Sequence, residues 1–255
     1  MAKDQAAAQW PARLLTNGNR DLARDGIWTW SLPALAARLP DGHSIRTCQQ
    51  AGVCALACYA REGTYKIPTV RDRHIRNLLY TVEDLGGWRD AMIRELAHQR
   101  FDGARVRIHD GGDFYSPEYL DAWLTVMAAS PHVGFYTYTK EVRLFRDQVE
   151  PAPPPNFKWV YSLGGKQDAL LVPGVDRVAD VFPTEPSIAR ARFHSQLKSD
   201  LLAVDGPSPV GMAANRIPKL QRRQGDRTFG QWQAETDRRT YQFAAWPDRP
   251  RLPPP

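Results

Sequence analysis

Alternation of apolar and polar residues first becomes regular in the segment 105–109. There Val106 and Ile108 alternate with basic residues, which is the period-two pattern of a half-buried strand. Further β-branched or aromatic runs begin near residues 134, 157, 177 and 201, so the strand starts recur every 20 to 29 residues. This spacing leaves room for a helix between successive strands. It predicts an α/β fold with a parallel sheet, either open or curled into a barrel.

A helix is expected between the first two of these strands. Ser116 is a suitable N-cap and Pro117 fits the first helical turn. Leu120, Trp123 and Met127 then recur on one face, as they do in a helix that packs on a sheet. The other expected elements are helices over residues 140–149 and 187–199 and a fifth strand over residues 201–205.

Three regions are predicted along the chain. Residues 1–43 combine Trp, Pro and Gly without a clear period and indicate an irregular N-terminal arm. Residues 44–215 hold the strand and helix pattern and form the predicted β/α domain. Residues 216–255 indicate a basic helical segment followed by a Pro-rich tail.

Composition narrows the class of protein. The chain has 255 residues, of which 42% are hydrophobic and 24% charged, values typical of a globular protein that needs no disulfide bonds. The longest apolar run is the eight residues 53–60, far below the ~18 that a membrane span requires. The first residues are charged and no apolar core follows them, so we expect no signal peptide. We therefore expect a cytoplasmic protein with no membrane partner.

The excess of positive charge is concentrated near the C-terminus. The whole chain has 34 basic and 28 acidic residues, a net charge of +6, and residues 216–255 hold nine basic and four acidic residues, a net charge of +5. Such a segment is able to contact phosphates. It predicts weak nucleic-acid binding, and a solvated basic helix is the alternative interpretation.

All three cysteines lie within eleven residues, at Cys48, Cys54 and Cys58. An odd number of cysteines in a reducing compartment does not form a complete set of disulfides. The cluster instead indicates metal ligands. A [4Fe–4S] cluster with one open iron is the favoured interpretation, and a zinc site or unligated packed thiols are the alternatives.

A second group of candidate residues lies where the predicted strands end. Gly111 and Gly112 allow a ligand to approach the backbone closely, and Asp113 is able to accept a hydrogen bond from an amine or a ribose hydroxyl. Tyr59 follows the last cysteine, and Lys140 and Ser162 end the next two strands. Because strand ends of a parallel sheet share one edge, we expect these six residues to bind a cofactor beside the cysteines.

The cysteine triplet followed by Gly111-Gly112-Asp113 resembles the radical S-adenosylmethionine superfamily. The resemblance implies a partial, curled parallel β/α barrel with the cluster at the carboxyl ends of its strands. It also implies that the open iron binds S-adenosylmethionine and that the Gly-Gly-acid motif receives the methionine amino group. The spacing of the cysteines here, C-x5-C-x3-C, differs from the usual C-x3-C-x2-C of that superfamily.

Three longer blocks are similar to the "gene product 88" domain proteins of actinobacteriophages. They are residues 48–65, 107–116 and 135–140, in that order, within the segment 44–165. The resemblance implies a phage-encoded protein with this cysteine cluster, acting in the cytoplasm of an infected cell.

Three functions remain open from the sequence. The first is a radical enzyme that uses S-adenosylmethionine at the open iron. The second is a non-radical iron–sulfur protein that binds a small molecule or senses redox state. The third is a nucleic-acid-binding or host-regulating phage factor with a structural cluster. We expect iron–sulfur binding on the partial barrel, and the sequence does not decide whether the protein is an enzyme.

Overall fold

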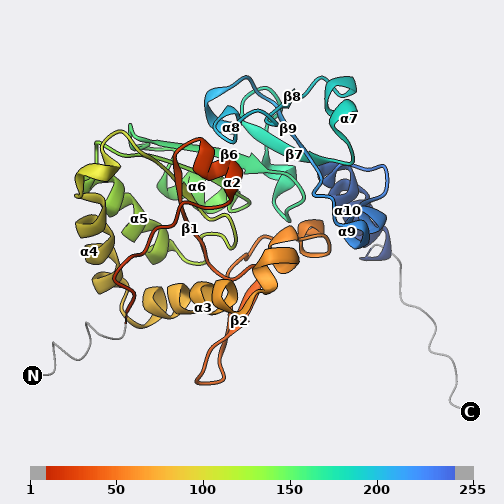
Figure 1. Ribbon diagram of the computed structural model, residues 1–255. Helices are drawn as coiled ribbons and strands as arrows, with labels where there is room; N and C mark the ends of the chain where they lie inside the picture. Colours follow the sequence, from red (N-terminus) through yellow and green to blue (C-terminus); the bar gives the residue numbers. More distant parts are fainter. Residues whose placement is uncertain (1–9, 245–255) are drawn as a thin grey trace, which may run out of the picture.

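The computed structural model describes residues 10–244, and seven strands within them form one sheet (Figure 1). Every neighbouring pair of strands in it is parallel. In spatial order the strands are β1 (Ile27–Trp30), β4 (Arg105–Ile108), β5 (Gly134–Thr139), β6 (Phe157–Ser162), β7 (Val178–Phe182), β9 (Val210–Ala213) and β8 (His194–Ser195). A separate antiparallel pair consists of β2 (Ala36–Arg38) and β3 (Ser44–Arg46).

Helices connect the strands and cover the sheet. The α-helices are α2 (Arg20–Arg24), α3 (Pro68–Glu83), α4 (Leu85–Leu96), α5 (Pro117–Ala129), α6 (Val142–Gln148), α7 (Glu185–Arg190), α8 (Leu202–Asp205), α9 (Pro218–Gln224) and α10 (Phe229–Ala244). The 3-10 helices are η1 (Val53–Ala55), η2 (Tyr59–Arg61), η3 (Gly63–Lys66), η4 (Gln99–Phe101) and η5 (Asp168–Leu170). The start of α5 follows the expected chemistry, since the Ser116 hydroxyl accepts a hydrogen bond from the Tyr119 N–H.

The main core lies between the sheet and helices α3 to α6. Val106 and Ile108 of β4 are fully buried there, together with Trp88 of α4 and Trp123 of α5. The rings of Trp88 and Trp123 meet edge to face, with their centroids 5.0 Å apart. Such aromatic pairs add stability beyond the apolar area that they bury.

The opposite face of the sheet has a smaller apolar core. It contains Ile27, Tyr136 and Val160 from the strands and Ala203 and Val204 from α8. The remainder of this face is polar, because the alternate positions of β4 are arginines. A cavity lined by residues of several strand ends lies on this face.

The expected α/β class with a parallel sheet is confirmed, and β4, β5, β6 and β7 lie where the pattern predicts them. Among residues 10–244 the sheet does not close, since β1 and β8 form its two edges. The predicted partial barrel like that of radical S-adenosylmethionine proteins is therefore not confirmed. The described part contains no helix long and apolar enough to cross a membrane.

Some predicted elements differ in the structure. The segment expected as an irregular arm supplies β1, which pairs with β4. Residues 201–205, predicted as a strand, contain helix α8, and the strand that pairs with β7 is β9. The run Leu-Leu-Ala-Val favours a helix as much as a strand, and the chain leaves the helix at Gly206. The predicted Pro-rich tail from residue 245 onward lies outside the described residues.

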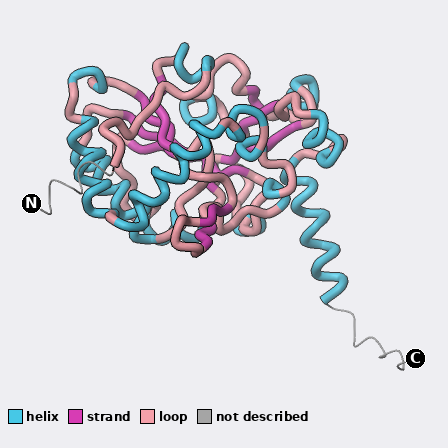
Figure 2. The backbone as a smooth tube through the Cα atoms, turned by 60° about the horizontal axis from the view of Figure 1, so that its bottom comes forward, coloured by secondary structure: helices cyan, strands magenta, loops and turns pink. Residues whose placement is uncertain are grey.

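Helix α10 begins against the sheet and then extends away from the rest of the chain (Figure 2). Near its start, the buried side chain of Gln233 accepts a hydrogen bond of 2.7 Å from the Val53 N–H, next to Cys54. Its amide also donates to Asp237. The helix thus fixes the cysteine loop from a position 180 residues later in the chain.

Replacing Gln233 by alanine leaves the buried Val53 N–H without its acceptor. We expect the Gln233→Ala variant to lose about 1–3 kcal/mol of unfolding free energy, measured by urea denaturation. The control is Gln221→Ala on the exposed surface of α9, which we expect to unfold like the parent. Equal stability of both variants would contradict this role for Gln233.

Candidate functional site

A cavity of about 460 Å³ opens on the polar face of the sheet, at the carboxyl ends of its strands. The structure brings all nine predicted site residues to this one cavity. They are Cys48, Cys54, Cys58, Tyr59, Gly111, Gly112, Asp113, Lys140 and Ser162. The ligand-binding roles of the six residues other than the cysteines stay predictions.

The glycine turn after β4 lets the backbone of Gly111 and Gly112 lie close to Leu32. Gly112 has a φ of +86°, and a Cβ atom placed on it would lie 2.7 Å from the Cβ of Leu32. The Leu32 N–H donates to the carbonyl of Gly111. Glycine is needed at position 112 because both the backbone conformation and the space exclude a side chain.

Asp113 is buried and holds the ends of β4 and β5 together. Its Oδ1 accepts from the Phe114 N–H and from the Thr139 hydroxyl at 2.8 Å, and its Oδ2 accepts from the Lys140 N–H at 3.0 Å. Burial raises the pKa of the Asp113 carboxyl, and these hydrogen bonds oppose the shift. Both oxygens are engaged within the protein, so the predicted contact of Asp113 with a ligand amine stays a prediction.

Lys140 joins the ends of β5 and β6. Its Nζ donates to the carbonyl of Ser162 at 2.9 Å and to the Ser162 hydroxyl at 2.7 Å. No carboxylate among the described residues forms an ion pair with this ammonium group. An ammonium group has three protons to donate, so one of them has no acceptor in residues 10–244.

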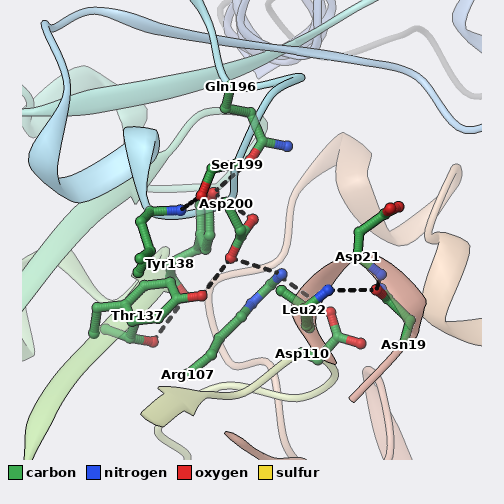
Figure 3. A network of polar contacts seen from close by, with 12 residues as sticks. Asn19, Asp21, Leu22, Arg107, Asp110, Thr137, Tyr138, Gln196, Ser199 and Asp200 are labelled. Carbon is green, nitrogen blue, oxygen red and sulfur yellow. Dashed lines mark hydrogen bonds and ion pairs between the residues drawn. The ribbon is translucent and has the colours of Figure 1, made fainter. Parts of the chain in front are cut away.

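A buried guanidinium organises another part of the cavity lining (Figure 3). Arg107 pairs with Asp110 and Asp200, each at 3.2 Å, and lies 4.8 Å from the ring centroid of Tyr138. Burial alone would lower the pKa of Arg107, but the carboxylates of Asp200 and Asp110 raise it well above its ordinary value. Asp200 also accepts from the hydroxyls of Tyr136 at 2.6 Å and Tyr138 at 3.0 Å.

Tyr59 is fixed by the same cluster. Its hydroxyl lies 2.8 Å from the carbonyl oxygen of Asp110 and 3.0 Å from the Asp110 carboxylate. The Tyr65 hydroxyl donates to the other carboxylate oxygen. The Asp110 carboxylate therefore has protein donors at both oxygens, as the carboxylates of Asp113 and Asp200 have.

His109 lies beneath the glycine turn and is neutral. Burial lowers its pKa to about 3. The Trp30 indole donates to the Tyr119 hydroxyl, which lies 2.9 Å from His109 Nε2. This pattern assigns the Tyr119 proton to the bond with Nε2 and places the imidazole proton on Nδ1. Within the described residues Nδ1 is buried without a partner.

The predicted [4Fe–4S] cluster is wrong. Among residues 10–244, no group of three or more His, Cys, Asp or Glu side chains is arranged to hold a metal ion. Cys48 Sγ instead accepts from the Leu35 N–H, Cys54 lies in η1, and Cys58 precedes η2. The three cysteines share a cavity, but they do not fit a cluster.

The three thiols are largely removed from water. Burial raises the pKa of all three, to about 11 for Cys58, which favours the neutral thiol over the thiolate. Without a cluster, two functions expected from the sequence are no longer supported. They are S-adenosylmethionine binding at an open iron and a nucleic-acid-binding factor with a structural cluster.

Several cavity residues were not identified from the sequence. Gln196 and Asp200 come from the segment before α8, Met212 from β9 and Phe229 from α10. No local motif marks them. Only the folding of the later strands beside β6 brings them to the cavity.

The fold and the cavity define a parallel α/β protein with a ligand-sized site at its strand ends. A family model described as "Gene product 88" matches residues 13–243. The chain belongs to this family, as the three sequence blocks indicated, and a bacteriophage origin is supported.

The chain is also similar to the "Gene 88 protein" of Mycobacterium phage L5. The two are 33% identical over 116 residues, which are 40% of this chain and 46% of that protein. The alignment thus spans less than half of the relative's length. No solved structure matches the chain.

Glu141 adds a titrating group beside the cysteine loop. It is buried next to Asp113, and its carboxylate accepts from the Gln50 N–H at 3.0 Å. Burial, together with the charge of Asp113, raises its pKa to about 8, although bonds from the Gln50 and Gln49 backbone and the charge of Lys166 oppose the shift. Above pH 4.5 the unfolded chain loses this proton while the folded chain retains it. The stability contribution of Glu141 therefore falls as the pH rises from about 4.5 to about 8.

Glu141→Gln keeps the oxygen that accepts from Gln50 and removes the titration. We compare the unfolding free energy of the variant with that of the parent. We expect this difference to favour the variant by about 2–4 kcal/mol more at pH 8 than at pH 5. Urea denaturation at both pH values measures this. Glu118→Gln, on an exposed side chain, is the control. A pH-independent difference between parent and Glu141→Gln would contradict the assignment.

The raised pKa values make the thiols slow nucleophiles. With a pKa of about 11 against an ordinary 9.0, Cys58 has a thiolate fraction about 100-fold lower than a free cysteine at neutral pH. We expect iodoacetamide labelling, followed by mass spectrometry, to be at least that slow in the folded protein. The labelling rate should still be rising at about pH 10, because the pKa of Cys58 lies above that pH. The urea-unfolded chain is the control. A plateau below pH 8 would show that a thiolate exists.

Proposed function

We propose that this protein binds a small molecule bearing a carboxylate or phosphate group, which accepts a hydrogen bond from the Lys140 ammonium group. The site is the cavity at the carboxyl ends of β4, β5 and β6. Ligands of open parallel sheets bind at this edge.

The balance of donors and acceptors in the cavity supports the anionic group. The carboxylates of Asp110, Asp113 and Asp200 each accept two or more hydrogen bonds from the protein. The Lys140 ammonium has no carboxylate partner among the described residues. A ligand that presents acceptors satisfies the donor that the protein leaves free, whereas an amine competes with donors already in place.

The neighbouring groups fit this ligand class. The Ser162 hydroxyl accepts from Lys140, so its own proton is available to a second oxygen of the ligand. The neutral thiols of Cys54 and Cys58 form a weakly polar wall beside this pair. In this proposal Lys140 and Ser162 donate hydrogen bonds to the anionic group of the ligand, and the cysteines line the cavity beside it.

Thermal unfolding with inorganic phosphate and a set of small mono- and dicarboxylates tests the proposal. We expect at least one of these anions to raise the Tm of the parent. Lys140→Met should weaken its binding at least tenfold, because it removes a charge-assisted hydrogen bond.

Lys158→Met is the matched control. Lys158 lies at the other end of β6, where its half-exposed ammonium pairs with Asp205. We expect this variant to bind the anions as the parent does. Equal loss in both variants, or no anion that stabilises the parent, would overturn the proposal.

A further inference from the structure

A second cationic surface lies outside the cavity, where η2, η3 and α9 meet. We call it the rim surface and define it by the exposed cations Arg61, Lys66, Lys219, Arg222 and Arg223 with the single acid Glu62. Its net charge is +4, five cations less one acid. It does not include the outer part of α10, where Arg238 and Arg239 are balanced by Glu235 and Asp237.

Specific contacts hold the parts of the rim surface together. Lys66 and Lys219 each pair with a different oxygen of Glu62, which links η3 to α9. The Arg223 guanidinium donates to the carbonyl of Leu56 at 2.7 Å and so links α9 to the cysteine loop. These contacts hold α9 beside η2 and η3, although Glu62 and Lys219 are 157 residues apart in the sequence.

The segment around η2 and helix α9, which carry the rim surface, also form part of the cavity wall. Cys58 and Tyr59 line the cavity beside Arg61, and Leu220 and Gln224 line it from α9, whose Arg222 is exposed. The rim surface thus adjoins the mouth of the cavity.

We propose that the rim surface binds the phosphate backbone of duplex DNA without sequence preference. Three of its five cations are arginines, whose planar guanidinium groups match phosphate oxygens. The described part of this surface exposes two aliphatic side chains, Leu56 and Ile67, and no large aromatic, which favours a hydrated polyanion over insertion into lipid. This binding is independent of Lys140 and of the ligand in the cavity.

Fluorescence anisotropy with a short labelled DNA duplex tests the proposal. With about four phosphate contacts, affinity should fall about 100-fold as the salt concentration rises from about 50 mM to about 200 mM. The test variant is the double charge reversal Arg61→Glu, Arg222→Glu, because neither side chain makes the contacts that link α9 to η3 and to the cysteine loop. We expect it to bind at least tenfold more weakly at the lower salt concentration, with a salt slope reduced by about two.

The matched control is Arg94→Glu, Arg143→Glu, which makes the same charge change on exposed positions of α4 and α6. We expect it to retain affinity within about threefold of the parent. Circular dichroism of both variants verifies that each is folded. Undetectable binding by the parent at the lower salt concentration, equal losses in both variants, or binding to anionic lipid vesicles but not to the duplex would each overturn the proposal.

Discussion

The polar face of the sheet depends on one buried guanidinium. Removing a cation from water costs several kcal/mol unless it is paired, and Arg107 is compensated by Asp110, Asp200 and the ring of Tyr138. Asp200 lies 93 residues beyond Arg107 in the sequence. The pairing therefore holds the segment before α8 across the face of β4 and β5. That segment forms one wall of the cavity, which would be an open sheet surface without it.

Strand β4 shows how one alternating sequence produces two different layers. Val106 and Ile108 point into the core beneath α5, and Arg107 between them points to the other face. Its polar partners on that face are Tyr136 and Tyr138 of β5, which reach the same carboxylate of Asp200. An apolar side chain in place of Arg107 would leave Asp110 and Asp200 buried with fewer donors, a cost that exceeds the gain from its own burial. The polar face is therefore stable only when Arg107 and the two carboxylates that pair with it are all present.

Local sequence patterns were sufficient to predict the central strands of the sheet and the residues along one wall of the cavity. Strands β4 to β7 and the start of α5 follow from alternation and from the Ser116-Pro117 cap, because these signals lie within a few residues. The position of Asp113, Lys140 and Ser162 at one cavity follows from the rule that parallel strands end at the same edge. Strand β1 was not predicted because Ile27-Trp-Thr-Trp30 is short and its stability comes from pairing with β4, 78 residues later. Asp200 and Gln233 were missed for the same reason, since only long-range contacts give them a role.

The clustering of Cys48, Cys54 and Cys58 along the sequence suggested metal ligands and did not reveal the charge of the thiols. Clustered cysteines are compatible with thiolate ligands and with neutral packed thiols, and the surroundings decide between them. Burial and the negative charge of Asp113 raise the pKa of Cys54, and the nearby ammonium of Lys140 only partly opposes them. A positive charge strong enough to ionise a thiol would have to be desolvated and aimed at the sulfur. Lys140 is instead hydrogen-bonded to Ser162, and its charge lowers the pKa of Cys54 by less than burial raises it. The cysteines thus stay protonated beside an ammonium group that lines the same cavity.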